Sequence, residues 1–282
     1  MKQYFLYSIT LMLMLFTSLP VCSQEIEPEK YTRHNKGKIY VYWGGNRAHY
    51  SDSDIRFWGN GYDFTLKDVE AQDKPKGWHI DYINPANMTI PQTNLRIGYF
   101  ITDHYNISIG VDHMKYVMTQ NQTVNINGHI DFPGSSYNGQ YQNTPIELTE
   151  EFLTFEHTDG LNYINLEIAR VDDIGKYFLN WNPDHFQLNL TEGVGGGILF
   201  PKTNAKLMGN ERHDDFHISG YGISAKVGIN VTFLKHFFIQ SELKGGYINM
   251  SDIKTTNNKA DKASQDFFYY QTNFVLGSIF KI

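Results

Sequence analysis

The sequence predicts an all-β protein, an antiparallel transmembrane β-barrel of about eight to twelve strands. Residues 217–233, "HISGYGISAKVGINVTF", alternate between a continuous apolar face and a face of small or polar side chains. A barrel strand needs only about nine to eleven residues to cross a membrane, so this run is long enough. After the N-terminal region no apolar run approaches the length of a spanning helix, and residues 267–282 alternate again.

The N-terminus is predicted to be a secretory signal peptide of residues 1–23. Residues 4–19 form a short apolar core, and Val21 and Ser23 satisfy the small-residue rule for cleavage after Ser23. A second interpretation is a lipoprotein, because Cys22 ends the sequence "LPVC", which is similar to a lipidation box. Ordinary cleavage removes this single cysteine, so disulfides and cysteine-based metal sites are not expected in the mature chain.

The composition narrows the class of protein. The full chain has 24 basic and 30 acidic residues, and the loss of Lys2 with the signal peptide leaves a net charge of about −7. No basic patch is visible, so nucleic acid is not an expected partner. With no second spanning run, a helical membrane protein is excluded. A secreted β-sandwich and a transmembrane barrel remain, and the length of the alternating runs favours the barrel.

The alternation assigns one face of each strand to lipid and the other to a crowded lumen. On the longest strand the apolar face carries Tyr221, Ile223, Ala225, Val227, Ile229, Val231 and Phe233. The lumen faces of several strands carry charges of both signs, so ion pairs inside the barrel are predicted. The predicted cations are Arg96, Lys226 and Lys244, and the predicted anions are Asp112, Glu167 and Glu242.

Ten strands are predicted, at residues 38–46, 62–71, 92–102, 105–118, 148–157, 161–172, 186–200, 216–233, 236–252 and 266–281. "TDHY" after Ile101 and "LKH" around Lys235 are short enough for periplasmic turns, whereas longer polar stretches follow other strands. An up-and-down count between these two turns is off by one. Either residues 123–132 add a strand, or one of the ten belongs to a loop hairpin.

The predicted organisation is a signal peptide (1–23), a periplasmic tail (24–37) and one barrel (38–282). The last strand, "FFYYQTNFVLGSIFKI", ends on a hydrophobic residue and resembles the assembly signal of bacterial outer-membrane barrels. "DHMKYVM" and "FEHTDGLNYIN" look like uncharacterised outer-membrane barrel proteins of Gram-negative bacteria, similar to OmpA and OmpW in architecture only. The resemblance implies location in the cell outer membrane. The implied partners are outer-membrane lipid, lipopolysaccharide and the barrel assembly machinery, which would read the C-terminal strand.

One histidine is a candidate catalytic residue. Outer-membrane acyl hydrolases, the lipid A deacylases and phospholipases, place a catalytic His two residues before a Ser nucleophile on one strand face. His157 shares a face with Leu153 and Phe155, interpreted as the lipid side, but the residue two further on is Asp159. An ionised carboxylate does not replace the hydroxyl, so the hydrolase pattern fails at its nucleophile. The alternative is a structural residue of a loop or girdle.

Other motifs carry weaker signals. "HDDFH" places His213, Asp215 and His217 on one side of an extended strand, where they could bind a divalent cation, although the spacing is not diagnostic of a metal. The glycine run 193–197, "GVGGG", lacks the residues of a phosphate loop and is predicted to relieve crowding between strands. Asn60 and Gly61 give a turn signal.

Three functional classes remain open. A barrel of eight to twelve strands has little open lumen, which favours a structural or surface-interaction role. The alternatives are a narrow channel for a small solute and a membrane acyl hydrolase around His157. No cofactor is expected, and the sequence leaves the oligomeric state and any ligand open.

Overall fold

The computed structural model describes residues 31–75, 92–210 and 215–281. The predicted signal peptide, the first part of the predicted tail and His213 lie outside the described residues. The described chain consists mostly of β-strands, with short 3-10 helices at η1 Tyr31–Arg33 and η4 Gly175–Tyr177. No helix in these three ranges is long and apolar enough to cross a membrane.

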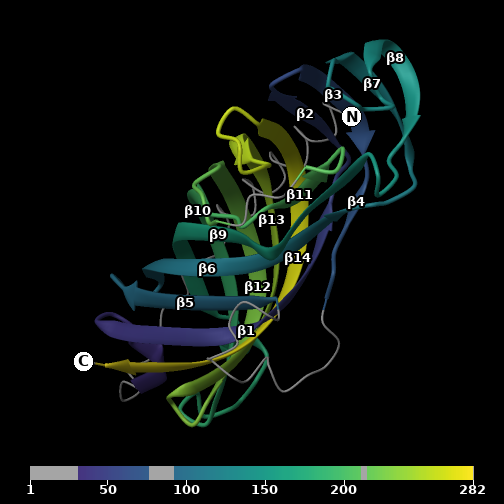
Figure 1. The fold of residues 1–282 in the computed structure, drawn as a ribbon. Helices are drawn as coiled ribbons and strands as arrows, with labels where there is room; N and C mark the ends of the chain where they lie inside the picture. Colours follow the sequence, from purple (N-terminus) through teal and green to yellow (C-terminus); the bar gives the residue numbers. More distant parts are fainter. Residues whose placement is uncertain (1–30, 76–91, 211–214, 282) are drawn as a thin grey trace.

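Eight strands form a closed antiparallel ring, which confirms the predicted barrel (Figure 1). Strand β1 pairs with β14 from Lys38↔Lys281 to Tyr50↔Tyr269, so the first ring strand meets the last and the ring has no open edge. In their order around the ring the strands are β1 Lys38–Tyr50, β5 Thr93–Phe100, β6 Tyr105–Met118, β9 Leu153–Asp173, β10 Phe186–Leu199, β12 Gly220–Phe233, β13 Phe237–Lys254 and β14 Lys262–Lys281.

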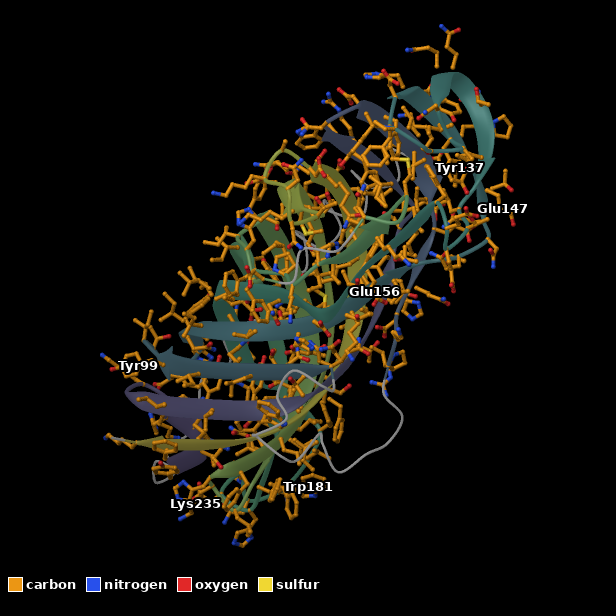
Figure 2. All side chains as sticks on the ribbon, viewed as in Figure 1. Tyr99, Tyr137, Glu147, Glu156, Trp181 and Lys235 are labelled. Carbon is orange, nitrogen blue, oxygen red and sulfur yellow. The ribbon has the colours of Figure 1, made fainter. Side chains whose placement is uncertain are left out.

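The two ends of the ring differ. One end, named the turn end here, carries the connections 101–104, 174–185 and 234–236, which include both predicted tight turns. The opposite end, the loop end, carries the longer connections, and beyond it the same sheet continues through further strands. In Figure 2, Trp181 and Lys235 mark the turn end, whereas Tyr137 and Glu147 lie at the far tip beyond the loop end.

The sheet beyond the loop end, named the loop-end extension, continues the wall of the barrel past the end of β1. Strand β2 Ser53–Gly59 pairs with the start of β14, and β3 Tyr62–Val69, β7 Thr123–Ile130 and β8 Gly139–Glu147 follow in that order. The predicted turn at Asn60 and Gly61 joins β2 to β3, with Gly61 at φ 85°. Two short strands pair with ring strands: β4 Ala71–Gln72 with β6 and β11 Asn204–Leu207 with β9.

The extension explains why the predicted number of strands did not fit an up-and-down barrel. Residues 62–71, predicted as a barrel strand, belong to β3 of the extension and to the first residue of β4, which pairs with ring strand β6. Residues 148–157 and 161–172, predicted as two strands, fall mainly within the single strand β9. Residues 123–132 do supply a strand, β7, but it lies outside the ring. A strand that covers a soluble core alternates like one that faces lipid, so the pattern alone could not separate the two.

An apolar belt surrounds the ring and confirms the predicted facing of the strands. Side chains on the outer face are exposed, among them Ile97, Ile109, Leu166, Ile223, Val227, Ile229, Phe274 and Leu276. Exposed aromatic rings border the belt, with Tyr99, Tyr105, Phe237 and Phe280 toward the turn end and Tyr221, Phe268 and Tyr270 toward the loop end. An apolar band with aromatic margins around a closed barrel is the surface that a bilayer requires.

Two buried apolar clusters lie inside the molecule. The larger one fills the extension and the loop end of the barrel, with Ile55, Phe57, Phe64, Leu66, Ile126, Phe152 and Phe155 among its members. The smaller one lies toward the turn end and contains Tyr40, Tyr42, Phe100, Phe238, Val275 and Ile279. Between the two clusters the lumen is filled by charged and polar side chains.

Candidate functional site: a closed lumen

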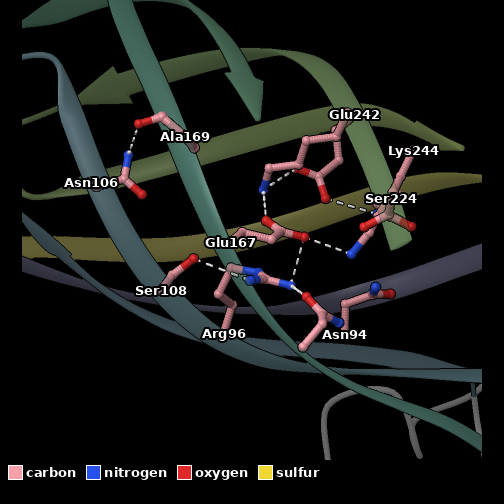
Figure 3. A network of polar contacts seen from close by, with 12 residues as sticks. Asn94, Arg96, Asn106, Ser108, Glu167, Ala169, Ser224, Glu242 and Lys244 are labelled. Carbon is pink, nitrogen blue, oxygen red and sulfur yellow. Dashed lines mark hydrogen bonds and ion pairs between the residues drawn. The ribbon is translucent and has the colours of Figure 1, made fainter. Parts of the chain in front are cut away.

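A network of six charged side chains crosses the middle of the lumen, and Glu167 is its centre. Glu167 Oε1 lies 2.9 Å from Nη2 of Arg96 and 2.6 Å from Nζ of Lys244. Its second oxygen, Oε2, lies 2.8 Å from Nζ of Lys226. One carboxylate therefore meets all three cations of the predicted set (Figure 3).

The other two carboxylates complete the network. Asp112 pairs with Lys244 and lies 4.0 Å from Arg96, and Glu242 lies 3.2 Å from Lys226. All six side chains are at most 3% exposed. Three cations face three anions, so the buried charges balance. The predicted pairing inside the barrel is confirmed.

Neutral side chains form hydrogen bonds with the charged groups, in addition to the ion pairs. Arg96 donates to the Tyr42 hydroxyl, to Ser108 Oγ and to Asn165 Oδ1. Asn94 donates to Asp112, and Asn273 donates to Glu242. Buried charges are tolerated only when they are paired and hydrogen-bonded in this way. The network is consequently a continuous partition across the lumen.

A small cavity lies on the turn-end side of this partition. Its volume is about 50 Å³, which holds a few water molecules and is far below the size of a pocket for an organic ligand. Amides and hydroxyls form much of its wall, and they bind one another: Asn189 donates to Asn230, and Asn230 donates to Gln240. Aromatic and apolar side chains of the smaller cluster, among them Tyr40, Phe100 and Phe238, form the rest of the wall, so the lumen is narrow and of mixed polarity here.

His157 lies on the loop-end side of the partition, above the apolar belt and inside the large apolar cluster. Its side chain is fully buried, with the rings of Phe155 and Tyr116 at 5.0 Å and 5.6 Å. Nδ1 lies 3.0 Å from Thr203 Oγ1, and Nε2 lies 3.0 Å from Gln265 Nε2. Burial lowers the pKa of His157 to about 3, so the ring is neutral at ordinary pH. These partners hold the ring as a structural element.

The structure corrects the interpretation of this strand face. His157 does share a face with Leu153 and Phe155, but all three point into the protein and none points to lipid. Asp159 is exposed, and its Oδ2 lies 3.8 Å from Nζ of Lys202. The register between β6 and β9 shifts between Met114 and Tyr116, so strict alternation fails at this point. His157 and Asp159 are therefore not brought together.

The residues proposed for a metal are only partly described. His213 lies outside the described residues, and Asp215 is exposed. His217 Nε2 lies 3.0 Å from Asp252 Oδ2, and the same carboxylate pairs with Lys262. In the described ranges no three His, Cys, Asp or Glu side chains are grouped as metal ligands would be.

The closed ring, the apolar belt and the filled polar interior define a membrane-spanning β-barrel. No family model matches the sequence, and no curated protein matches it. Among solved structures, the chain is similar to the outer membrane protein OprG from Pseudomonas aeruginosa, with 10% identity, a TM-score of 0.38, and coverage of 89% of this chain and 99% of that one.

Two further structures show a comparable likeness. The outer membrane protein AlkL has 10% identity and a TM-score of 0.41, with 92% of this chain and 98% of that one covered. Ail, the attachment invasion locus protein of Yersinia pestis, has 11% identity and a TM-score of 0.29, with 85% and 99% covered. All three proteins share at most 11% of their residues with this chain, and the likeness is one of fold alone.

Proposed function

We propose that this protein is an outer-membrane β-barrel of a Gram-negative bacterium that holds its loop-end extension at the cell surface for an interaction. The observation that carries the proposal is the extension itself. It has an apolar core built from β2, β3 and β7, including Ile55, Phe57 and Phe64, and this core is continuous with the inside of the barrel. An ordered sheet of this kind is a rigid platform, unlike a set of flexible loops.

The filled lumen argues against diffusion of solutes as the main role. A solute entering from the loop end would have to displace the large apolar cluster and then the ion network around Glu167. Removing one partner of a buried ion pair costs several kcal/mol, so the partition does not open by thermal motion of single side chains. A narrow channel is therefore the second candidate, and conductance tests it directly.

The acyl hydrolase is not supported by the surroundings of His157. Its imidazole is sealed from solvent and from lipid, and its two nitrogen atoms contact Thr203 and Gln265. A general base must reach the proton that it abstracts in a bound substrate. In the described part of the chain the ring is covered on all sides, so a substrate would need the loop end to open before it met His157.

Location and assembly follow the same proposal. The predicted signal peptide would send the chain across the inner membrane, and the C-terminal strand would be read by the barrel assembly machinery. The apolar belt would contact outer-membrane lipid, and the margin nearer the loop end would contact lipopolysaccharide. The turn end would face the periplasm, because short turns and both chain ends lie there in outer-membrane barrels.

Epitope tags test the orientation. One tag is inserted after Gly134, where an added Cβ meets no atom within 4 Å, and a second is inserted beside Trp181, which is exposed at the turn end. Antibody should bind the first tag on intact cells and the second only after permeabilisation. The reverse pattern would overturn the display of the extension. Steady conductance steps of the wild-type protein in planar bilayers would favour the narrow channel instead.

A further inference from the structure

The chain just before the first ring strand is docked onto the turn end of the barrel. Residues 31–37, part of the predicted free tail, contact all three turn-end connections. Thr32 is buried and donates through its backbone N and its Oγ1 to Asp184 Oδ1, at 3.1 Å and 3.0 Å. Asp103 Oδ1 accepts from the backbone N of Lys36 at 2.9 Å, and the ring of Tyr31 lies 5.2 Å from that of His236.

Lys38 ties this segment to the lumen. Its side chain is buried at the start of β1, and Nζ donates to the Tyr31 carbonyl oxygen at 2.7 Å and to Asn35 Oδ1 at 3.2 Å. The ammonium also lies 3.9 Å from the centre of the Tyr31 ring. No carboxylate of the described residues lies within 4 Å of it, so residues 31–37 replace the counter-ion with carbonyl oxygens and an aromatic face.

The segment covers the turn-end cavity. Thr32, Asn35 and Lys38 belong to the cavity wall, together with Thr191 deeper inside. Three lysines line the cavity, and no acidic side chain does so among the described residues. Lys226 is paired with Glu167 and Glu242, and Lys235 is paired with Asp184. Lys38 is therefore the lysine of the cavity wall that has no paired carboxylate in the described chain.

We propose that residues 31–37 are a latch that closes a vestibule at the turn end, and that the open vestibule attracts small anions through Lys38. The latch is bound by hydrogen bonds that involve side chains, by ring contacts and by a backbone hydrogen bond from Gly37 N to the Phe100 carbonyl oxygen at 2.9 Å, while the ring begins only at Lys38. It can therefore detach without breaking any pairing of β1 with β14. Detachment removes the groups that solvate Lys38 and leaves its ammonium facing water at the mouth of the cavity.

Cysteine accessibility tests the latch. The single cysteine is first removed from the full chain by Cys22→Ala. Thr191→Cys then places a thiol in the cavity wall, at a side chain that hydrogen-bonds to none of the described residues. The thiol is treated with an anionic (sulfonatoethyl) or a cationic (trimethylammonioethyl) methanethiosulfonate reagent. Modification should be slow with the latch intact and faster by about tenfold or more when residues 31–36 are deleted.

Two further variants make the result specific. Thr32→Asp keeps every latch residue but sets a carboxylate against Asp184, so it should also accelerate modification of the thiol at position 191. Ser224→Cys places a thiol on the loop-end side of Lys226, beyond the ion network, and should stay unreactive with or without the latch. On gels, the unboiled sample of every variant should migrate faster than its boiled sample, as a folded barrel does.

The charge of the reagent tests the attraction. In the deletion variant the anionic reagent should react faster than the cationic one by about tenfold, and Lys38→Met in the same background should remove that preference. Equal rates with and without residues 31–36 would overturn the latch. A preference for the cationic reagent, or an anionic preference that survives Lys38→Met, would overturn the role of Lys38.

Discussion

Lys226 of β12 and Glu167 of β9 form an ion pair across strand β10, with 2.8 Å between Nζ and Oε2. Strand β10 presents Gly193 and Gly195 beneath this pair. A Cβ on Gly195 would lie 2.6 Å from Cγ of Glu167, and one on Gly193 would lie 3.3 Å from Cε of Lys226. The glycine run 193–197, predicted to relieve crowding, thus leaves room for the charged network.

Gly195→Val should destabilise the barrel by roughly 1–3 kcal/mol, because the new side chain must displace Glu167 or bend the strand. Gly196→Val is the matched control, since a Cβ there meets its nearest atom at 3.5 Å. Urea unfolding in lipid vesicles measures both variants. Equal free energies of unfolding for the two would show that the ion pair does not need the space above Gly195.

Glu167→Gln should cost roughly 3–5 kcal/mol, because it leaves three buried cations with only two carboxylates. Asp54→Asn is the control: its pair with Lys67 lies on the exposed face of the extension and should contribute less than about 1 kcal/mol. The free energy of unfolding in vesicles is measured for both variants. A loss as small as that of Asp54→Asn would show that Glu167 is not the centre of the partition.

The ring and its charged interior could be predicted because both depend on a period of two. Alternation placed Ile229 outside and Lys226 inside, and a closed ring then had to bring the six charges together. The extension could not be separated from the ring in the same way. Phe57 and Phe64 alternate with polar residues just as barrel residues do, and only the pairing partners show that they cover an apolar core.

The site residues show where local pattern stops being informative. His157 was singled out as a single polar residue, but its partners Thr203 and Gln265 lie 46 and 108 residues further along the chain. The latch was missed because residues 31–37 are polar and irregular, which is typical of a free tail. Their order comes from Asp103 and Asp184, which are distant in sequence and carry no recognisable motif.

His157 should make the stability of the extension depend on pH. Its pKa is about 3 when folded and 6.5 in the unfolded chain, so the unfolded state alone takes up the proton between these values. The neutral ring contributes its full stability above pH 6.5, and this is lost as the pH falls toward 3. Between pH 7 and pH 5 the loss should be about 2 kcal/mol.

His157→Gln removes the titrating group and should flatten that part of the curve. The measurement is hydrogen exchange of the amides of β2, β3 and β7 as a function of pH, corrected for intrinsic rates, in wild type and variant. The comparison matters because every other titratable side chain is the same in the two proteins, so the difference between the curves reports on His157 alone. Parallel curves for the two proteins would contradict a buried neutral His157.

Deleting residues 278–282 should block assembly of the barrel. In the closed ring Val41 pairs with Ser278 and Lys38 with Lys281, so the truncation strips the partner from the first residues of β1. The backbone N–H and C=O groups left unpaired there would each cost several kcal/mol in hydrocarbon. The same residues carry the hydrophobic end that resembles an assembly signal, so the truncated chain should accumulate in the periplasm and be degraded.

Removing Gly134 and Ser135 from the tip of the extension, far from this seam, should leave the amount in the outer membrane unchanged. Membrane fractionation measures both proteins, and normal outer-membrane levels of the C-terminal truncation would show that the β1–β14 seam is dispensable for closure.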